Sequence, residues 1–181
     1  MEKTKSTFKT KLLRPAKADT KDPWTFVILP KKASDILPRR GRTTVQGTLN
    51  GAPFQVTLEP DGQLSHWMRV DEKLRKAAGA EVGDEVTVQI SPVEEEPDPA
   101  VPADFQKALK QFPDAKSGWE KTTPLARVDW VHWIESAKQE KTREKRIAVA
   151  CDKLANGKLR VCCFDPSGYY DKSKSAPEEA L

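Results

Sequence analysis

The chain has 181 residues but no apolar run long enough to cross a bilayer. Its start, MEKTKSTFKTKLL, is charged and lacks the apolar core of a secretory signal peptide. Cysteine is scarce, because only Cys151, Cys162 and Cys163 are present, an odd number that includes an adjacent pair. That pattern disfavours a disulfide framework and favours a reducing compartment. We therefore expect a cytoplasmic protein without membrane insertion.

A strong excess of one charge sign is also missing. The 31 basic and 27 acidic residues leave a formal net charge of +4, which is too balanced for a strong, non-specific nucleic-acid binder. Neither a G-x-S-x-G nucleophile elbow nor a G-x-x-x-x-G-K-[ST] phosphate loop is present. His66 and His132 are distant in sequence, and Cys162-Cys163 lacks the C-x-x-C spacing of a zinc site. The sequence thus predicts no catalytic residue, no metal ion and no cofactor.

What the chain does contain is a repeated plan in residues 24–48 and 65–90. Each copy runs an apolar strand into a short, basic, helix-like turn, then a glycine, then a second strand. The first copy reads WTFVILP, KKASDIL, Gly41 and TTVQGTL, and the second reads LSHWMRV, DEKLRKA, Gly79 and EVTVQI. A strand–turn–strand unit that cannot bury its own apolar face is expected to close against its partner into a small barrel.

Apolar patterns predict six strands, and local signals predict the turns between them. Asn50-Gly51 is a strong hairpin signal, because both central residues tolerate positive φ. Asp71 is a candidate N-cap of a short helix, and Asp84 is expected to cap backbone amides in its own turn. The expected strands are Phe8–Leu12, Trp24–Leu29, Thr43–Leu49, Phe54–Leu58, Leu64–Val70 and Glu85–Ile90.

From residue 91 to 102 the chain reads SPVEEEPDPAVP, a stiff acidic spacer that marks a domain boundary. Beyond it the apolar spacing becomes helical over Ala103–Phe112. A second helical pattern begins at Thr122 or Thr123, with Pro124 near its first position, and continues towards Leu154 either unbroken or with a break near Gln139–Thr142. Leu159–Phe164 is a candidate strand, and a loose tail follows from Asp165. The expected division is a barrel at 5–92, a linker at 93–102, a helical module at 103–158 and a partly disordered tail at 159–181.

Several of these segments resemble known families. VDEKLRKAAGAEVGDEVTVQI is similar to the swapped-hairpin barrel of AbrB-like proteins, and together with WTFVILP and VQGTLNGAPF it resembles the single-chain barrel of domain-of-unknown-function family 1905. VPADFQKAL and WIESAKQEKTREKRI resemble the OmpD-associated, bacteriocin-protection (YdeI-type) family. The resemblance implies an α+β protein with an N-terminal closed, double-split barrel and a small C-terminal helical module. It implies a role in bacteriocin protection, in line with an indirect cytoplasmic stress role, and brings no reaction or cofactor.

The basic segment of the second helical pattern is the main candidate for a binding site. At helical spacing its cations and a hydroxyl share one face and can grip a phosphate or carboxylate, with a tryptophan as a stacking wall. The alternative is a solvated face in which Glu140 and Glu144 pair with neighbouring bases. A pocket between the modules, lined by Trp67 and Trp133, is a further prediction. The candidate residues are Trp67, Trp133, Lys138, Thr142, Arg143 and Arg146.

Together these residues predict a non-enzymatic binding or adaptor protein with a protein partner or a small anionic ligand. Replacing both Arg143 and Arg146 by Ala is expected to leave stability nearly unchanged. Two alternatives remain open. One is an AbrB-like DNA-binding regulator that uses the basic turns of the barrel at Arg40, Arg42, Arg75 and Lys76. The other is an enzyme that acts on a small anionic substrate in a groove between the modules.

Overall fold

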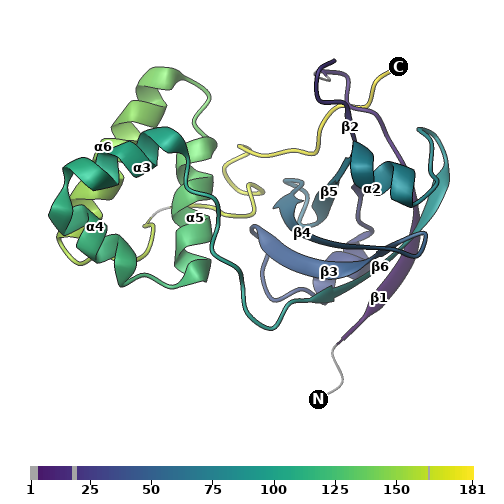
Figure 1. Ribbon diagram of the computed structural model, residues 1–181, viewed down its shortest axis with the longest axis horizontal. Coiled ribbons are helices and arrows are strands. Elements are labelled where there is room, and N and C mark those ends of the chain that lie inside the picture. The colour runs from purple at the N-terminus through teal and green to yellow at the C-terminus, as the bar shows by residue number, and fades with distance from the viewer. Residues whose placement is uncertain (1–3, 18–19, 163) are drawn as a thin grey trace. The chain divides into compact units, whose positions relative to one another are not determined.

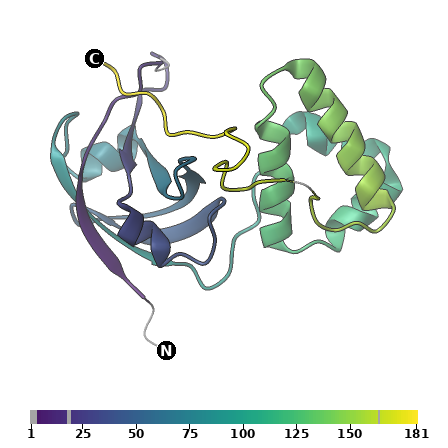
Figure 2. The same ribbon diagram turned by 180° about the vertical axis from the view of Figure 1, so that it is seen from behind.

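The computed structural model describes residues 4–17, 20–162 and 164–181, so the predictions made for Cys163 lie outside the described residues. The chain is α+β and divides into two units (Figures 1 and 2). One, here called the β unit, contains the chain up to Glu95 together with Ser167–Leu181. The other, here called the helical unit, spans Glu96–Pro166.

All six predicted strands and the short helix after Asp71 are confirmed, with ends shifted by a few residues. The described elements of the β unit are β1 (Ser6–Lys11), β2 (Trp24–Ile28), α1 (Lys31–Asp35), β3 (Thr43–Leu49), β4 (Ala52–Pro60), β5 (His66–Asp71), α2 (Glu72–Ala77) and β6 (Glu85–Pro92). Local signals explain their limits. Asn50 and Gly51 take φ of 47° and 85° between β3 and β4, Asp71 accepts a hydrogen bond from the Leu74 amide, and Asp84 accepts one from the Glu81 amide.

The six strands form one antiparallel sheet in the order β1-β6-β3-β4-β5-β2. The two repeats interlock, because the first strand of one pairs with the first strand of the other (β2 with β5) and the second strands also pair (β3 with β6). The sheet curls until its outer strands approach each other, as Figure 1 shows. They meet at an isolated bridge in which the Leu13 and Phe26 backbones exchange two hydrogen bonds of 2.9 Å. The structure is thus a curled half-barrel sheet, and a fully closed double-split barrel is not confirmed.

Alternation along the strands places one set of apolar side chains inside the curl. In β6 the side chains of Val86, Val88 and Ile90 are all buried, while the residues between them are exposed. They join an apolar core formed by residues from around the curled sheet. The largest buried members of this core include Leu12, Leu29, Leu49, Leu58 and Met68. This apolar interior is what holds the two repeats together.

The helical unit contains α3 (Ala103–Gln111), α4 (Pro113–Glu120), α5 (Pro124–Glu135) and α6 (Glu140–Ala155). Thr123 is the N-cap of α5 and accepts a hydrogen bond from the Ala126 amide. The break between α5 and α6 confirms the two-helix reading, whereas α4 was not predicted. Its sequence, PDAKSGWE, contains weak helix formers and is stabilised by packing against α6. None of the helices that the structure describes combines the length and the apolar character needed to cross a membrane.

The C-terminal segment belongs to the β unit. The Ala16 amide donates to the Glu178 carbonyl, and the Ala180 amide donates to the Arg14 carbonyl. The described residues of Leu159–Phe164 form no strand. The chain therefore leaves the β unit, builds the helical unit and returns, so the helical unit is joined to the β unit at both ends.

Candidate functional site

The predicted basic segment lies on α6 and on the loop before it. Ile147 and Ala150 face the core of the helical unit, which places Arg143 and Arg146 at the edge of that core, where both are half-buried. Lys138 is exposed in the loop, and Thr142 is half-buried one turn before Arg146. Thr142 and the two arginines thus lie on one side of α6, whereas Lys138, which was expected to share this helical face, precedes the helix.

Arg143 is held by an acidic partner from another helix. Its Nε lies 2.7 Å from Asp104 Oδ2 and its Nη2 lies 3.1 Å from Asp104 Oδ1, a bidentate pair that joins α6 to α3. The hydrogen bond from Arg143 lowers the pKa of the Asp104 carboxyl. The guanidinium fork of Arg143 is therefore occupied, and its replacement by Ala would leave Asp104 without this partner. The expectation that stability would be nearly unchanged needs revision for Arg143.

Arg146 is held in a different way. Its Nη1 donates to the Trp133 carbonyl at 2.6 Å and to Ser136 Oγ at 3.0 Å, and its guanidinium carbon lies 5.4 Å from the centre of the Trp133 ring. Trp133 packs edge-on against the fully buried Trp130 at 5.9 Å. Among the described residues, no hydrogen-bond partner is present for Nε or Nη2 of Arg146. One edge of this guanidinium is thus fixed in place by the Trp133 carbonyl and Ser136.

Arg127, also in the helical unit, differs from Arg146 because each of its three guanidinium nitrogens has a partner. Its Nε donates to Thr122 Oγ1 at 2.8 Å, its Nη1 pairs with Asp98 at 2.8 Å, and its Nη2 donates to the Trp119 and Glu120 carbonyls at 3.2 Å. Arg127 ties the linker residue Asp98 to the helices, which makes it structural. Sequence reasoning did not single it out, because its partners come from several separate segments.

The basic turns of the β unit each have intramolecular partners. Arg40 pairs with Asp35 at 2.8 Å and Arg42 with Glu59 at 2.9 Å. Arg75 pairs with Glu81 at 3.1 Å, and Lys76 pairs with Glu72 at 2.9 Å. A nucleic-acid phosphate would have to compete with a carboxylate at every one of these four cations.

Trp67 lies in an aromatic group on β2 and β5. It stacks on Trp24 at 6.1 Å between ring centres and contacts Phe26 edge-on, while the Arg69 guanidinium lies 4.6 Å from the Trp24 ring. Trp67 belongs to the β unit and Trp133 to the helical unit. A pocket lined by both tryptophans therefore stays a prediction.

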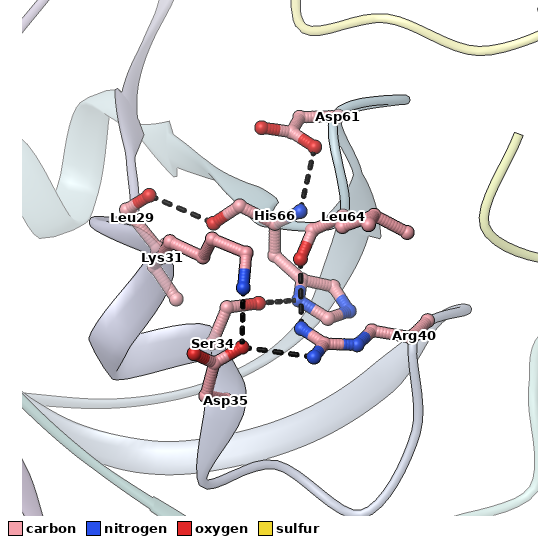
Figure 3. Close-up of polar contacts among 9 residues, drawn as sticks. Leu29, Lys31, Ser34, Asp35, Arg40, Asp61, Leu64 and His66 are labelled. Atoms are coloured by element: carbon pink, nitrogen blue, oxygen red, sulfur yellow. Dashed lines mark hydrogen bonds and ion pairs between the residues drawn. The ribbon is translucent and has the colours of Figure 1, made fainter. Parts of the chain in front are cut away.

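Sequence reasoning missed a buried polar cluster around His66, shown in Figure 3. His66 Nε2 lies 2.8 Å from the Gly41 carbonyl, which assigns the proton to Nε2 and leaves Nδ1 to accept a short hydrogen bond from Ser34 Oγ. Arg40, in the loop after α1, donates a hydrogen bond to the Leu64 carbonyl at 2.7 Å, just before β5. Burial lowers the pKa of His66, which keeps the imidazole neutral.

A serine hydrogen-bonded to a histidine can act as a nucleophile and its base. Here, however, Ser34 is 1% exposed and His66 is fully buried, and the second ring nitrogen is committed to a backbone carbonyl. The pair therefore locks α1 and the following loop onto β5. The spacing of 32 residues between Ser34 and His66 gave no signal that could have revealed it from the sequence.

The described residues contain no group of three or more His, Cys, Asp or Glu side chains that could hold a metal ion. Cys151 is buried in the core of the helical unit, where burial raises the pKa of its thiol. Cys162 is exposed.

The fold and these clusters define a two-unit α+β protein in which an antiparallel sheet unit is followed by an all-helical unit. Residues 8–90 match the model of a domain of unknown function (DUF1905), and residues 98–157 match the model described as bacteriocin-protection, YdeI or OmpD-associated (OmdA). These are the two families whose resemblance was noted in the sequence, and they match in the expected order, so the two matches confirm that resemblance. No curated protein matches the chain.

Proposed function

We propose that this protein is a non-enzymatic binding or adaptor protein of the bacteriocin-protection type. In this proposal the helical unit holds an anionic group of its ligand or protein partner at Arg146, and the protein acts in the cytoplasm. The observation that carries the proposal is the geometry of Arg146, whose guanidinium is fixed by Trp133 and Ser136 while Nε and Nη2 have no partner among the described residues. A side chain that is already immobilised loses less conformational entropy when it binds.

Neighbouring groups support this assignment. Thr142 lies one helical turn from Arg146 and offers a hydroxyl, and Lys138 follows Ser136 by two residues and is exposed. Lys141 and Lys145 add two exposed cations on α6, whereas Arg143 acts as a brace through Asp104. The proposed site therefore consists of Trp133, Lys138, Thr142 and Arg146, with Arg143 in a supporting role.

Inorganic phosphate is the probe that tests the site directly. We expect the Nε–H resonance of Arg146 to shift and saturate during a phosphate titration at constant ionic strength, because that N–H has no intramolecular acceptor. The Nε–H groups of Arg127 and Arg143 serve as internal controls, since both are hydrogen-bonded. If all three resonances respond alike, or none responds, Arg146 is not an anion site.

A matched pair of variants distinguishes binding by the guanidinium group of Arg146 from a general effect of positive charge on α6. Arg146→Gln and Lys145→Gln each remove one positive charge from α6. We expect the first to abolish the saturable phosphate shift and to remove protection of cells exposed to a bacteriocin, and the second to preserve both. Equal protection by both variants would contradict the proposal.

Duplex DNA binding through Arg40, Arg42, Arg75 and Lys76 is the less favoured alternative, because each cation would exchange an existing ion pair for a phosphate contact. Absence of gel retardation at low salt would dispose of it. We also infer that the curled sheet behaves as a closed double-split barrel, and the bridge between Leu13 and Phe26 supports this view.

A further inference from the structure

The stretch after β1 pairs with the C-terminal segment at an isolated bridge. The Ala16 amide donates to the Glu178 carbonyl at 2.7 Å, and the Ala180 amide donates to the Arg14 carbonyl at 2.8 Å. These two bonds place Pro15 opposite Glu179 in an antiparallel bridge. Pro15 sits at the position of the pair that makes no hydrogen bond, so its missing N–H costs the pairing nothing.

A pocket lies beside this pairing. It has a volume of about 330 Å³ and is lined by Pro15, Ala16, Lys17 and Trp24 on one side and by Pro177 and Glu178 of the tail on the other. Backbone pairing combined with a side-chain pocket is how folded domains take up extended peptides as an added strand. The bridge at Pro15 and Glu179 supplies the backbone pairing, and Pro177 and Glu178 of the tail form one wall of the pocket.

Charge favours an acidic occupant. Arg14 and Lys17 lie on either side of Pro15 and Ala16 and are exposed, and the tail presents the exposed Glu179 in the bridge and the exposed Glu178 next to it. Their opposite signs make the groove electrostatically complementary to the sequence PEEAL.

The tail is also held upstream of the groove. It passes over the turn at Gly62, where an added Cβ would lie 2.0 Å from the Lys174 carbonyl oxygen. Only a glycine lets the tail pass this closely. Gly51 supplies a matched control, because it has a similarly positive φ of 85° but nothing within 4 Å of an added Cβ.

We propose that residues 14–17 and Trp24 form a strand-accepting groove for an extended acidic peptide of a partner protein. The C-terminal tail is the tethered occupant of this groove and competes with the partner. A tethered segment competes at an effective concentration in the millimolar range, so a partner peptide binds well only when the tail is displaced. This inference concerns the β unit and does not depend on the anion site at Arg146.

Two variants of the full chain displace the tail by different means. Gly62→Ala places a methyl group where the tail backbone runs, and Ala180→Pro removes the N–H that donates to the Arg14 carbonyl. The controls are Gly51→Ala, which has the same backbone strain in open space, and Ala180→Ser, which keeps the N–H. Trypsin cleavage after Lys172 and Lys174 reports release, and we expect it to be at least about tenfold faster in the two variants than in the controls.

Fluorescence anisotropy of a labelled peptide of residues 175–181 (SAPEEAL) then measures binding in trans. We expect the two variants to bind it at least about tenfold more tightly than the wild-type chain and the controls do. The same peptide carrying Glu178→Lys and Glu179→Lys should bind at least about fivefold more weakly, because its charge is reversed.

Each remaining outcome overturns the proposal. If trypsin shows a released tail and the peptide does not bind, the stretch is not a peptide groove. If cleavage is unchanged in both variants, the contacts at Gly62 and Ala180 do not hold the tail. If the charge-reversed peptide binds equally well, the groove does not select acidic segments.

Discussion

His66 joins three segments of the β unit through a single side chain. It accepts a hydrogen bond from Ser34 on α1, it donates one to the Gly41 carbonyl in the following loop, and it belongs to β5. The nearby cations Arg40 and Arg39 favour the neutral ring, whereas Asp61 and the Gly41 hydrogen bond favour the charged ring. The effect of burial is larger than the effects of Asp61 and the Gly41 hydrogen bond, so the pKa of His66 is lowered.

A lowered pKa makes the stability of the β unit depend on pH. Between the lowered value in the folded protein and the ordinary value of 6.5, the unfolded chain binds the proton and the folded chain does not. We therefore expect the stability of the β unit to fall as pH drops below about 6.5, with a slope of at most about 1.4 kcal/mol per pH unit for one proton. Urea unfolding at several pH values measures this slope.

A His66→Gln variant is the control for this prediction. It removes the titrating group but retains an amide that can donate and accept. The difference between the wild-type and variant slopes isolates His66 from the other titrating groups. Identical slopes would show that His66 does not contribute to the pH dependence.

At the level of single residues, the sequence predicted which residues are basic and which share a helical face, because both follow from residue type and spacing. It did not predict what they bind. Arg143 meets Asp104 and Arg146 meets the Trp133 carbonyl only because α3 and α5 pack beside α6. The same spacing is compatible with an anion grip and with an internal brace, and the structure shows the brace at Arg143.

Among the helices, α4 and α6 approach closely at Gly118. This glycine is buried, and an added Cβ would lie 2.1 Å from the Leu154 carbonyl oxygen of α6. In an exposed helix, a change from Gly to Ala would favour the helix by about 1 kcal/mol. Here the contact with backbone decides the outcome, because the Leu154 carbonyl is held in the last turn of α6, where it accepts a hydrogen bond from the Gly157 amide at 3.1 Å.

We therefore expect Gly118→Ala to destabilise the helical unit by about 1–3 kcal/mol, the usual range for overpacking, even though it improves helix propensity. Hydrogen exchange of the α6 amides measures the change. Ser117→Ala is the control, since Ser117 is exposed on the same helix and its replacement should shift stability by less than about 0.5 kcal/mol. A Gly118→Ala protein as stable as the wild type would mean that the two helices can move apart at little cost.

The sequence predicted most elements correctly, since strands with alternating apolar residues and turns such as Asn50-Gly51 are encoded locally. It missed α4, whose Gly and Ser content disfavours a helix. Ala115 and Trp119 stabilise that helix by entering the core of the helical unit, and this contribution depends on the other helices.

On the scale of the whole molecule, most buried apolar residues that the structure describes belong to one of two separate clusters. Leu58 belongs to the cluster inside the curled sheet, and Leu154 belongs to the cluster among the helices. The two clusters have no residue in common. We expect the units to respond independently when either core is damaged.

Leu58→Ala and Leu154→Ala test this independence, because each removes a large side chain that is almost completely buried. Each should destabilise its own unit by about 2–5 kcal/mol. Hydrogen exchange should accelerate for slowly exchanging amides of the β unit in the first variant and of the helical unit in the second. Acceleration in both units by either variant would show that they unfold as one cooperative body.

The sequence by itself determined the α+β class, the repeated strand–turn–strand plan and most of the strands, because these depend on local periodicity, turn chemistry and residue order. Tertiary structure alone decided that the tail returns to pair with Arg14 and Ala16, that His66 bonds to Ser34, that Arg143 pairs with Asp104, and that Arg146 bonds to the Trp133 carbonyl. All of these contacts join residues that are distant along the chain. Such pairs leave no periodic trace in a single sequence, because their formation depends on the packing of every element between them.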